Sequence, residues 1–306
     1  MYIVDFLKSL MRKANIPLIV YLVLNVFLIS WIISALFEVT EWAGILGGIV
    51  LYIISLTIAL SPLGEWILSL QTGCKKIKRA EQIDFLYPLF KEVYDKAKKS
   101  DPSIPDDVQL YMNNDKTPNA FATGRKTICL TEGMLHMPKE QIKATLGHEF
   151  GHLAHKDTDM ILLVCVGNLM VNIMILGIRL IIGFFYIICG TFARMFGKQD
   201  LGLSALVTDL YYLAVTAIVS GLIWVWTKVG TLLVMKSSRS NEYEADEFSF
   251  ALGYGNELCM LLDNICESDA KGLFASLAST HPDKDDRIAK LQELGATYRI
   301  QYDVNR

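Results

Sequence analysis

The sequence predicts an α-helical membrane protein, in which four transmembrane helices carry a mostly α-helical α+β domain with a small β-sheet. Two observations predict this fold class. Hydrophobic residues make up 52% of the 306-residue chain, and with glycine counted in place of tyrosine the apolar share is about 55%, above the roughly 45–50% of soluble domains. The excess is concentrated in long uncharged runs, and the polar stretches between them show helical and strand-like patterns.

The composition also excludes several classes of protein. So high a hydrophobic content rules out a disordered or collagen-like chain. A formal net charge of -3 provides no polybasic surface, so nucleic acid is not an expected partner. The six cysteines are scattered without any C-x-x-C pair, which excludes a cysteine-type zinc motif and favours a reducing compartment.

Four uncharged runs reach the length of about 18 residues with which a helix can cross a bilayer. They are residues 14–37, 42–64, 160–178 and 210–227. The few residues between the first two runs allow only a turn, so these two helices are expected to form a hairpin. The first run is too long for the apolar part of a signal peptide, and no small-x-small cleavage site follows it.

Basic residues flank these runs mainly on one side of the predicted membrane. They are Lys8, Arg12 and Lys13 before the first run, Lys75, Lys76, Lys78 and Arg79 after the second, and Lys228, Lys236 and Arg239 after the fourth. Between the third and the fourth lie only Arg179, Arg194 and Lys198. The positive-inside rule therefore places both termini and residues 72–159 in the cytoplasm.

The polar block at residues 80–135 predicts one helix followed by a small sheet. A helical period relates three of its apolar residues, Phe85, Leu89 and Val93. Three short strand-like runs follow, at residues 108–112, 119–122 and 127–130. A turn at Gly124 and Arg125 separates the last two. The second block, residues 237–306, predicts three or four helices with ends at Gly253 and Gly295.

The most informative residues form an H-E-x-x-H sequence, on a helix expected to begin at Pro138: His148, Glu149, Phe150, Gly151 and His152. Residues i and i+4 of a helix point the same way, so the two imidazoles converge while Glu149 lies beside them. A zinc hydrolase requires this geometry, because two neutral nitrogens hold Zn²⁺ and a carboxylate takes a proton from its bound water. The alternative is two surface histidines on an amphipathic helix.

The same helix has polar residues at both of its ends. They are Lys139, Glu140, Lys143, Lys156, Asp157 and Asp159. We expect this polar flank to keep the metal-binding helix out of the hydrocarbon, at the surface of the bilayer. An intramembrane zinc protease, whose metal ligands lie inside spanning helices, is therefore disfavoured.

A catalytic zinc site needs a third protein ligand. His155 is a poor candidate, because seven residues of straight helix place its Cα about 10.5 Å from that of His148. A carboxylate from elsewhere is more suitable, and Glu242 and Asp246 share one helix face. One of them can ligate zinc while the other accepts the free ring N–H of a ligating histidine. Taken alone, this acidic stretch is more typical of a solvated helix face.

These motifs give the chain a resemblance to the HtpX-type membrane zinc metalloproteases, relatives of the CAAX prenyl proteases. The likeness runs over most of the length, with two transmembrane helices before the motifs and a second membrane hairpin between them. The matching motifs are PNAFATG at 118–124, GHEFGH at 147–152, NEYEAD at 241–246, and Thr280-His281-Pro282 with Asp286-Arg287-Ile288.

The resemblance implies a zincin-type (gluzincin) catalytic domain with one Zn²⁺ per chain. It implies that Glu242 is the third zinc ligand, that Asp246 supports a ligating histidine and that Glu149 is the general base and acid. By the same likeness, the edge strand of the sheet pairs with an extended polypeptide substrate. This strand consists of Asn119, Ala120, Phe121 and Ala122. An ordinary inner strand with a hairpin turn is the alternative.

The roles of His281 and Arg287 stay open at this point. The family likeness places both near the site, where a cation or an imidazole can stabilise the oxyanion of a tetrahedral intermediate. Equally, His281 can mark the start of a helix before Pro282, with Arg287 in a structural ion pair.

A zinc site shared by His148, His152 and Glu242 also limits the topology. The chain must cross the membrane an even number of times between residues 152 and 242, so residues 160–178, 180–193 and 210–227 cannot all be spans. Residues 180–193 are then an interfacial segment beyond the third helix. Alternatively, the third helix is shifted along the chain and Arg179 turns into the bundle.

The sequence therefore predicts a split catalytic domain. Its expected parts are a transmembrane hairpin at 1–71, the first half of the catalytic domain at 72–159, a second hairpin at 160–236 and the second half at 237–306. The expected activity is that of a zinc endopeptidase in the lipid bilayer of a prokaryotic plasma (inner) membrane, with its site facing the cytoplasm. The resemblance implies misfolded or damaged membrane proteins as substrates, in protein quality control and the stress response.

Two alternative functions agree less well with the sequence. A CAAX-type protease of prenylated proteins is disfavoured, because that branch has seven spans and this chain predicts four. A membrane chaperone with a structural zinc would be expected to lack the general base, and Glu149 is present.

Overall fold

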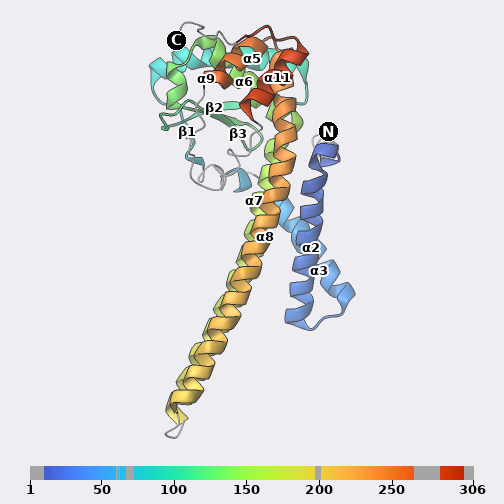
Figure 1. The fold of residues 1–306 in the computed structure, drawn as a ribbon, viewed down its shortest axis with the longest axis vertical. Coiled ribbons are helices and arrows are strands. Elements are labelled where there is room, and N and C mark those ends of the chain that lie inside the picture. The colour runs from blue at the N-terminus through green and yellow to red at the C-terminus, as the bar shows by residue number, and fades with distance from the viewer. Residues whose placement is uncertain are drawn as a thin grey trace, which may run out of the picture.

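Figure 1 shows the computed structural model of the protein, which describes residues 10–59, 61, 63–66, 72–196, 201–264 and 283–299. Two helical hairpins project in the same direction from a unit of shorter elements, which we call the head (Figure 1). The head consists of the sheet β1–β4, helices α5, α6, α9 and α11, and the C-terminal end of α8.

The first hairpin consists of α2 (Ile16–Phe37) and α3 (Glu41–Ala59), and a short helix η1 (Lys13–Asn15) precedes it. Small residues let the two helices approach closely, since a Cβ atom at Gly48 would lie only 3.0 Å from the Cα of Ser30. Both helices contain candidate membrane spans, Ile16–Ala35 and Glu41–Ile58. The predicted first hairpin is confirmed.

The second hairpin consists of α7 (Asp157–Phe196) and α8 (Leu201–Ala251). At about 1.5 Å per residue, a helix as long as α7 extends about 60 Å, roughly twice the thickness of a bilayer's hydrocarbon core. The candidate span in α8 is Asp209–Trp226, whereas α7 has a shorter apolar segment, Leu176–Phe192. The described residues thus contain three candidate spans, where the sequence predicts four.

Residues 180–193 continue α7 and do not form a separate interfacial segment. Among the described residues, no left-handed residue interrupts α7, so one helix runs through Arg179. The guanidinium of Arg179 donates to Ser220 Oγ on α8 at 2.7 Å. Of the two arrangements that the sequence allows, the structure therefore favours the one in which Arg179 turns toward a neighbouring helix.

The two hairpins contact each other between α2 and the middle of α8. Trp226 Nε1 on α8 donates to the buried Asn25 Oδ1 on α2 at 3.0 Å. The ring of Tyr21 packs on Trp226, with 6.1 Å between the centroids, and Gly230 leaves room for Tyr21, because a Cβ there would lie 2.5 Å from that ring. These contacts hold α2 beside the part of α8 that leads into the head.

The head contains a four-stranded mixed sheet with the order β1-β2-β4-β3. Its strands are β1 (Lys75–Lys76), β2 (Gln109–Asn113), β3 (Ala120–Thr123) and β4 (Thr127–Thr131). The central pair β2–β4 is parallel, and the two outer pairings are antiparallel. Strand β3 is therefore at the edge of the described sheet, as the resemblance implies.

Helices cover one face of this sheet and enclose the core of the head (Figure 1). They are α5 (Ala80–Ser100), α6 (Lys139–His155), α9 (Gly255–Asn264) and α11 (Lys284–Leu294), with η2 (Glu132–His136) after β4. The predicted ends at Gly253 and Gly295 are confirmed by left-handed φ values of 93° and 114°. Strand β1 was not predicted, because a two-residue Lys-Lys strand has no apolar alternation.

Candidate metal centre

Helix α6 carries the H-E-x-x-H residues, and most of its residues are buried. Its apolar residues Ile142, Leu146 and Phe150 are fully buried in the core of the head. His148 and Glu149 are also buried, with 7% and 5% of their surface exposed. The predicted helix after Pro138 is confirmed, and the surface-histidine alternative is wrong, because the second half of α8 covers this face of α6.

Two glycines of α6 permit the close approach of α8. A Cβ atom at Gly151 would lie 2.8 Å from the Cα of Ala245, and one at Gly147 would lie 2.9 Å from Ser249 Oγ. Both distances are shorter than Cβ contacts in real proteins. At Gly151 the neighbour is backbone, so only glycine fits there without a shift of α8, whereas at Gly147 the Ser249 hydroxyl would have to rotate. This close packing brings Glu242, one turn before Ala245, to the two histidines.

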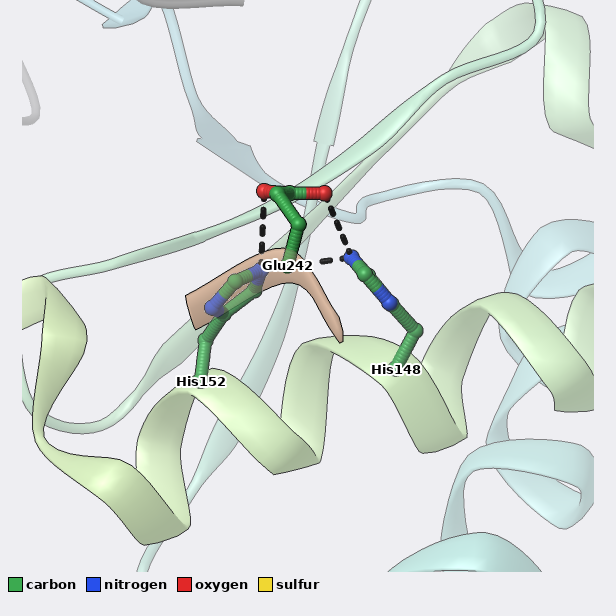
Figure 2. A group of neighbouring side chains, drawn as sticks. All are labelled: His148, His152 and Glu242. Carbon is green, nitrogen blue, oxygen red and sulfur yellow. Dashed lines mark hydrogen bonds and ion pairs between the residues drawn. The ribbon is translucent and has the colours of Figure 1, made fainter. Parts of the chain in front are cut away.

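The two histidine Nε2 atoms and the Glu242 carboxylate lie close together, with a different carboxylate oxygen facing each ring (Figure 2). His148 Nε2 lies 3.2 Å from His152 Nε2 and 3.5 Å from Glu242 Oε2, while His152 Nε2 lies 3.4 Å from Glu242 Oε1. A tetrahedral zinc ion with bonds of about 2.1 Å separates its ligand atoms by about 3.4 Å. The group His148, His152 and Glu242 therefore fits a zinc ion, and among the described residues it is the group that can hold a metal.

Asp246 and Arg287 lie directly behind the ligands. Asp246 Oδ1 is 2.8 Å from His148 Nδ1, and Arg287 donates to both Asp246 oxygens, from Nε at 2.7 Å and from Nη2 at 2.6 Å. Arg287 Nη1 also lies 3.2 Å from Glu242 Oε2. Of the two readings of Arg287, the ion pair is the one that the geometry supports.

Opposite charges lie side by side in this buried cluster and shift the pKa values of its members. Burial raises the pKa of Asp246, but the charge and hydrogen bonds of Arg287 outweigh burial and hold it below its ordinary value. Burial lowers the pKa of His148, but the hydrogen bonds to Asp246 and Glu242 outweigh burial and raise it. Arg287 thus keeps Asp246 ionised as the hydrogen-bond acceptor for His148.

Asp157 is a functional candidate that the sequence reasoning missed. Its Oδ2 lies 3.0 Å from His152 Nδ1, so it stands to His152 as Asp246 stands to His148. We expected Lys156, Asp157 and Asp159 to be a polar flank of α6, but they are 4%, 5% and 1% exposed. These three side chains lie inward because α7 begins immediately after a left-handed turn at Lys156, with φ of 61°. That the polar flank keeps α6 out of the hydrocarbon stays a prediction.

Glu149 contacts the outer edge of β3. Thr131 N donates to Asn119 O at 2.9 Å, and in an antiparallel pair the bonded and non-bonded residues alternate, so the amides of Ala120 and Ala122 face away from β4. The first donates to Asn119 Oδ1 at 2.8 Å and the second to Glu149 Oε2 at 2.6 Å. The expected general base therefore lies against the expected substrate edge.

The comparison with known families agrees with this geometry. Residues 89–295 match the family described as peptidase family M48, and this match spans more than half of the chain. The chain belongs to peptidase family M48. It is therefore a metallopeptidase, and its metal-binding group is His148, His152 and Glu242.

Several relatives of this M48 peptidase are named protease HtpX. The chain is 28% identical over 266 residues to protease HtpX of Alcanivorax borkumensis, covering 79% of this chain and 80% of that protein. It is 28% identical over 194 residues to a protease HtpX homolog of Neisseria meningitidis serogroup C, covering 58% and 63%. To protease HtpX of Legionella pneumophila strain Corby it is 35% identical over 88 residues, 27% and 30% of the two chains. This M48 metallopeptidase is therefore similar to the HtpX proteases over most of its length, and its described helices include three candidate membrane spans.

Two further histidines, His155 and His281, were considered as site residues from the sequence. His155 Nδ1 lies 3.9 Å from Glu244 Oε2, and His155 is outside the metal-binding group of this M48 peptidase. Arg12, at the start of the membrane hairpin, also contacts Glu244. His281 lies outside the described residues, so its proposed place near the site stays a prediction.

Proposed function

We propose that the protein is a membrane-anchored zinc endopeptidase that cleaves misfolded or damaged membrane proteins at the cytoplasmic surface of a prokaryotic inner membrane. One Zn²⁺ per chain is held by His148, His152 and Glu242. The observation that carries this proposal is the group His148, His152 and Glu242, whose facing nitrogen and oxygen atoms lie 3.2–3.5 Å apart, directly beside a buried Glu149.

The chemistry divides between the metal and Glu149. When bound, Zn²⁺ supplies a Lewis acid that polarises the scissile carbonyl and acidifies a water molecule. Glu149 accepts the proton of that water and later delivers it to the leaving amine. Glu149 directly follows the ligand His148 on α6, so its carboxylate lies beside the metal-binding group. The presence of this base favours an enzyme over a chaperone with a structural zinc.

The substrate is proposed to bind as an additional strand on β3. In this structure the amide of Ala122 donates a hydrogen bond to Glu149 Oε2 at 2.6 Å. A carbonyl oxygen of the substrate would accept that hydrogen bond instead, which would release Glu149 for proton transfer. The small side chains of Ala120 and Ala122 allow close approach of another backbone. An extended segment on this edge would lie beside Glu149.

Asp246, Arg287 and Asp157 are proposed to orient the ligands. A carboxylate on the second ring nitrogen fixes the tautomer in which the other nitrogen is free to bind the metal. Both histidines have such a carboxylate, at 2.8 Å and 3.0 Å. Arg287 is proposed as a positioning residue, because its donors face Asp246 and Glu242.

Several contacts support a site at the bilayer surface. Arg12 contacts Glu244, two residues after Glu242, and α2 enters its candidate span at Ile16. Four crossings are proposed, with α7 as the fourth, because α7 and α8 form a hairpin that returns the chain to the head. Both termini and the head then lie on one side, which the flanking basic residues assign to the cytoplasm.

The test compares purified wild type with Glu149→Gln in detergent. The variant should keep its bound zinc, because Glu149 is not a ligand, and should cleave an unfolded membrane protein about 10²–10⁴-fold more slowly. Zinc is measured by elemental analysis and cleavage by gel. A variant that retains zinc and cleaves as fast as wild type would contradict the assignment of Glu149.

A further inference from the structure

A basic cavity lies on the head away from the metal centre. It has a volume of about 220 Å³ and lies where β1 meets the start of α5. Its lining includes four cations from one short segment and one acid: Lys75, Lys76, Lys78, Arg79 and Glu132. The catalytic chemistry proposed above uses none of these residues.

The charge of this cavity is strongly positive. All four of its cations are exposed, and the carboxylate of Glu132 is engaged by Lys116 Nζ at 2.7 Å. Helix α5 begins directly after Arg79, and within the described part of the chain no side chain caps its first turn. The positive end of the α5 dipole therefore adds to the field of the four cations. Such a cavity is complementary to a phosphate-bearing anion.

The neighbouring segment indicates where the anion comes from. Between the end of α3 and β1, Leu63 and Trp66 are 51% and 57% exposed, and aromatic residues of this kind concentrate at membrane interfaces. Glu65 fixes this segment to the head by accepting the amide of Arg125 at 3.3 Å. The sheet lies on the side of the head toward which the hairpins project (Figure 1). In the sequence, the cavity residues follow this exposed apolar segment, with Lys75 nine positions after Trp66.

We propose that the cavity formed by Lys75, Lys76, Lys78 and Arg79 binds the phosphate headgroup of an anionic phospholipid of the membrane in which the chain is anchored. The proposal rests on the membrane anchoring of the proposed function and is independent of zinc and of Glu149. Strand β1 pairs with β2, and the ladder continues through β4 to the edge strand β3. A headgroup bound at one edge of the sheet therefore fixes the position of the opposite edge over the bilayer.

The test measures the thermal unfolding temperature of the full-length protein in a neutral detergent. Three additives are titrated: a short-chain phosphatidylglycerol, the matched phosphatidylcholine and inorganic phosphate. We expect a saturable rise with phosphatidylglycerol alone, which weakens as salt is added because the interaction is electrostatic. Equal stabilisation by phosphatidylcholine, or by phosphate at the same concentration, would overturn the proposal of an anionic lipid.

Variants assign the effect to the cavity. Replacing all four cations by glutamine should weaken the apparent affinity for phosphatidylglycerol at least about a hundredfold, since each cation contributes about fivefold near an anionic surface. Lys78→Gln with Arg79→Gln should lose about 25-fold and tests the proposal if the fourfold variant does not fold. Undiminished affinity in either folded variant would overturn it.

A matched control removes the same charge elsewhere. Four exposed lysines of α5 and α11 are replaced by glutamine: Lys91, Lys99, Lys284 and Lys290. These helices lie on the other side of the head from the sheet (Figure 1), so affinity should be unchanged. An equal loss of affinity in the control would mean that net charge alone governs lipid binding, which would overturn the assignment of the binding site to the cavity. All variants are also expected to cleave an unfolded protein in detergent at the wild-type rate. This activity assay separates a failure of the lipid proposal from a failure of the proposed function.

Discussion

Each histidine of the metal centre has a carboxylate behind it, and the two carboxylates come from different helices. Asp246 belongs to the end of α8, whereas Asp157 is the first residue of α7. Both contacts are short: the one to His148, at 2.8 Å, is buried, and the one to His152, at 3.0 Å, is partly buried. Each helix of the membrane hairpin therefore places a carboxylate against a metal ligand.

Asp157→Asn and Asp246→Asn should each weaken zinc binding about 10–100-fold, because an amide neither attracts nor orients the ring N–H as a carboxylate does. Affinity is measured by competition with a chelator. Glu293→Gln, at an exposed position of α11, is the control and should leave affinity unchanged. If Asp157→Asn binds zinc as tightly as the control, Asp157 has no role at the centre.

Arg287→Met should destabilise the head by roughly 3–5 kcal/mol, because it leaves two buried carboxylates without their cation. Arg287→Lys should recover part of this loss, since it restores the charge without the two-pronged contact. Unfolding in denaturant provides the measurement. Lys290→Met removes an exposed ion pair with Glu293 and should cost less than about 1 kcal/mol. Equal losses in the two methionine variants would contradict the structural role of Arg287.

At this scale the sequence predicts the ligands better than their surroundings. The spacing of His148 and His152 places both rings on one helix face, so it alone predicts their convergence. Nothing local distinguishes Glu242 from a solvated acid, and the family resemblance identified it. Asp157 was missed because its place depends on the left-handed turn at Lys156, which sequence periodicity does not reveal.

Helices α6 and α7 are joined by a single buried residue. Lys156 is 4% exposed, and its Nζ donates to Ser103 O at 2.9 Å. A joint this short fixes the direction in which α7 leaves the metal-binding helix. The membrane hairpin and the metal centre are therefore parts of one packed structure.

Gly151→Ala should separate α8 from α6, because the new Cβ would meet the backbone of Ala245 at 2.8 Å. We expect a loss of about 1–3 kcal/mol in stability from this overpacking and a lower zinc affinity, since Glu242 moves with α8. Gly177→Ala is the control, because no described atom lies within 4 Å of its added Cβ. Unchanged zinc affinity in folded Gly151→Ala would contradict the role of this close approach.

Elements with a strong local pattern were predicted well. Helix α5 and strands β2, β3 and β4 lie within a few residues of their expected places, because apolar periodicity and the turn at Gly124 mark them. The pattern failed for β1, whose two lysines are held by β2 through backbone pairing. It also failed to join residues 160–178 and 180–193, since the charge of Arg179 interrupts the apolar run but not the helix.

At the scale of the whole molecule, the chain leaves the head after two ligands and returns with the third. His148 and His152 precede the hairpin of α7 and α8, and Glu242 follows it. The metal centre is therefore complete only when that hairpin is formed and packed. Composition and length indicate the membrane helices but not this division, which becomes apparent only when the motifs on both sides are assigned to one site.

The central claim is that one metal ion joins the two halves of the chain through Glu242. The most direct measurement is the zinc content per chain of purified wild type and of Glu242→Ala, prepared in parallel. We predict about one zinc per wild-type chain and loss of the metal in Glu242→Ala, with both proteins folded. Full zinc occupancy in the variant would contradict the claim and show that another residue completes the site.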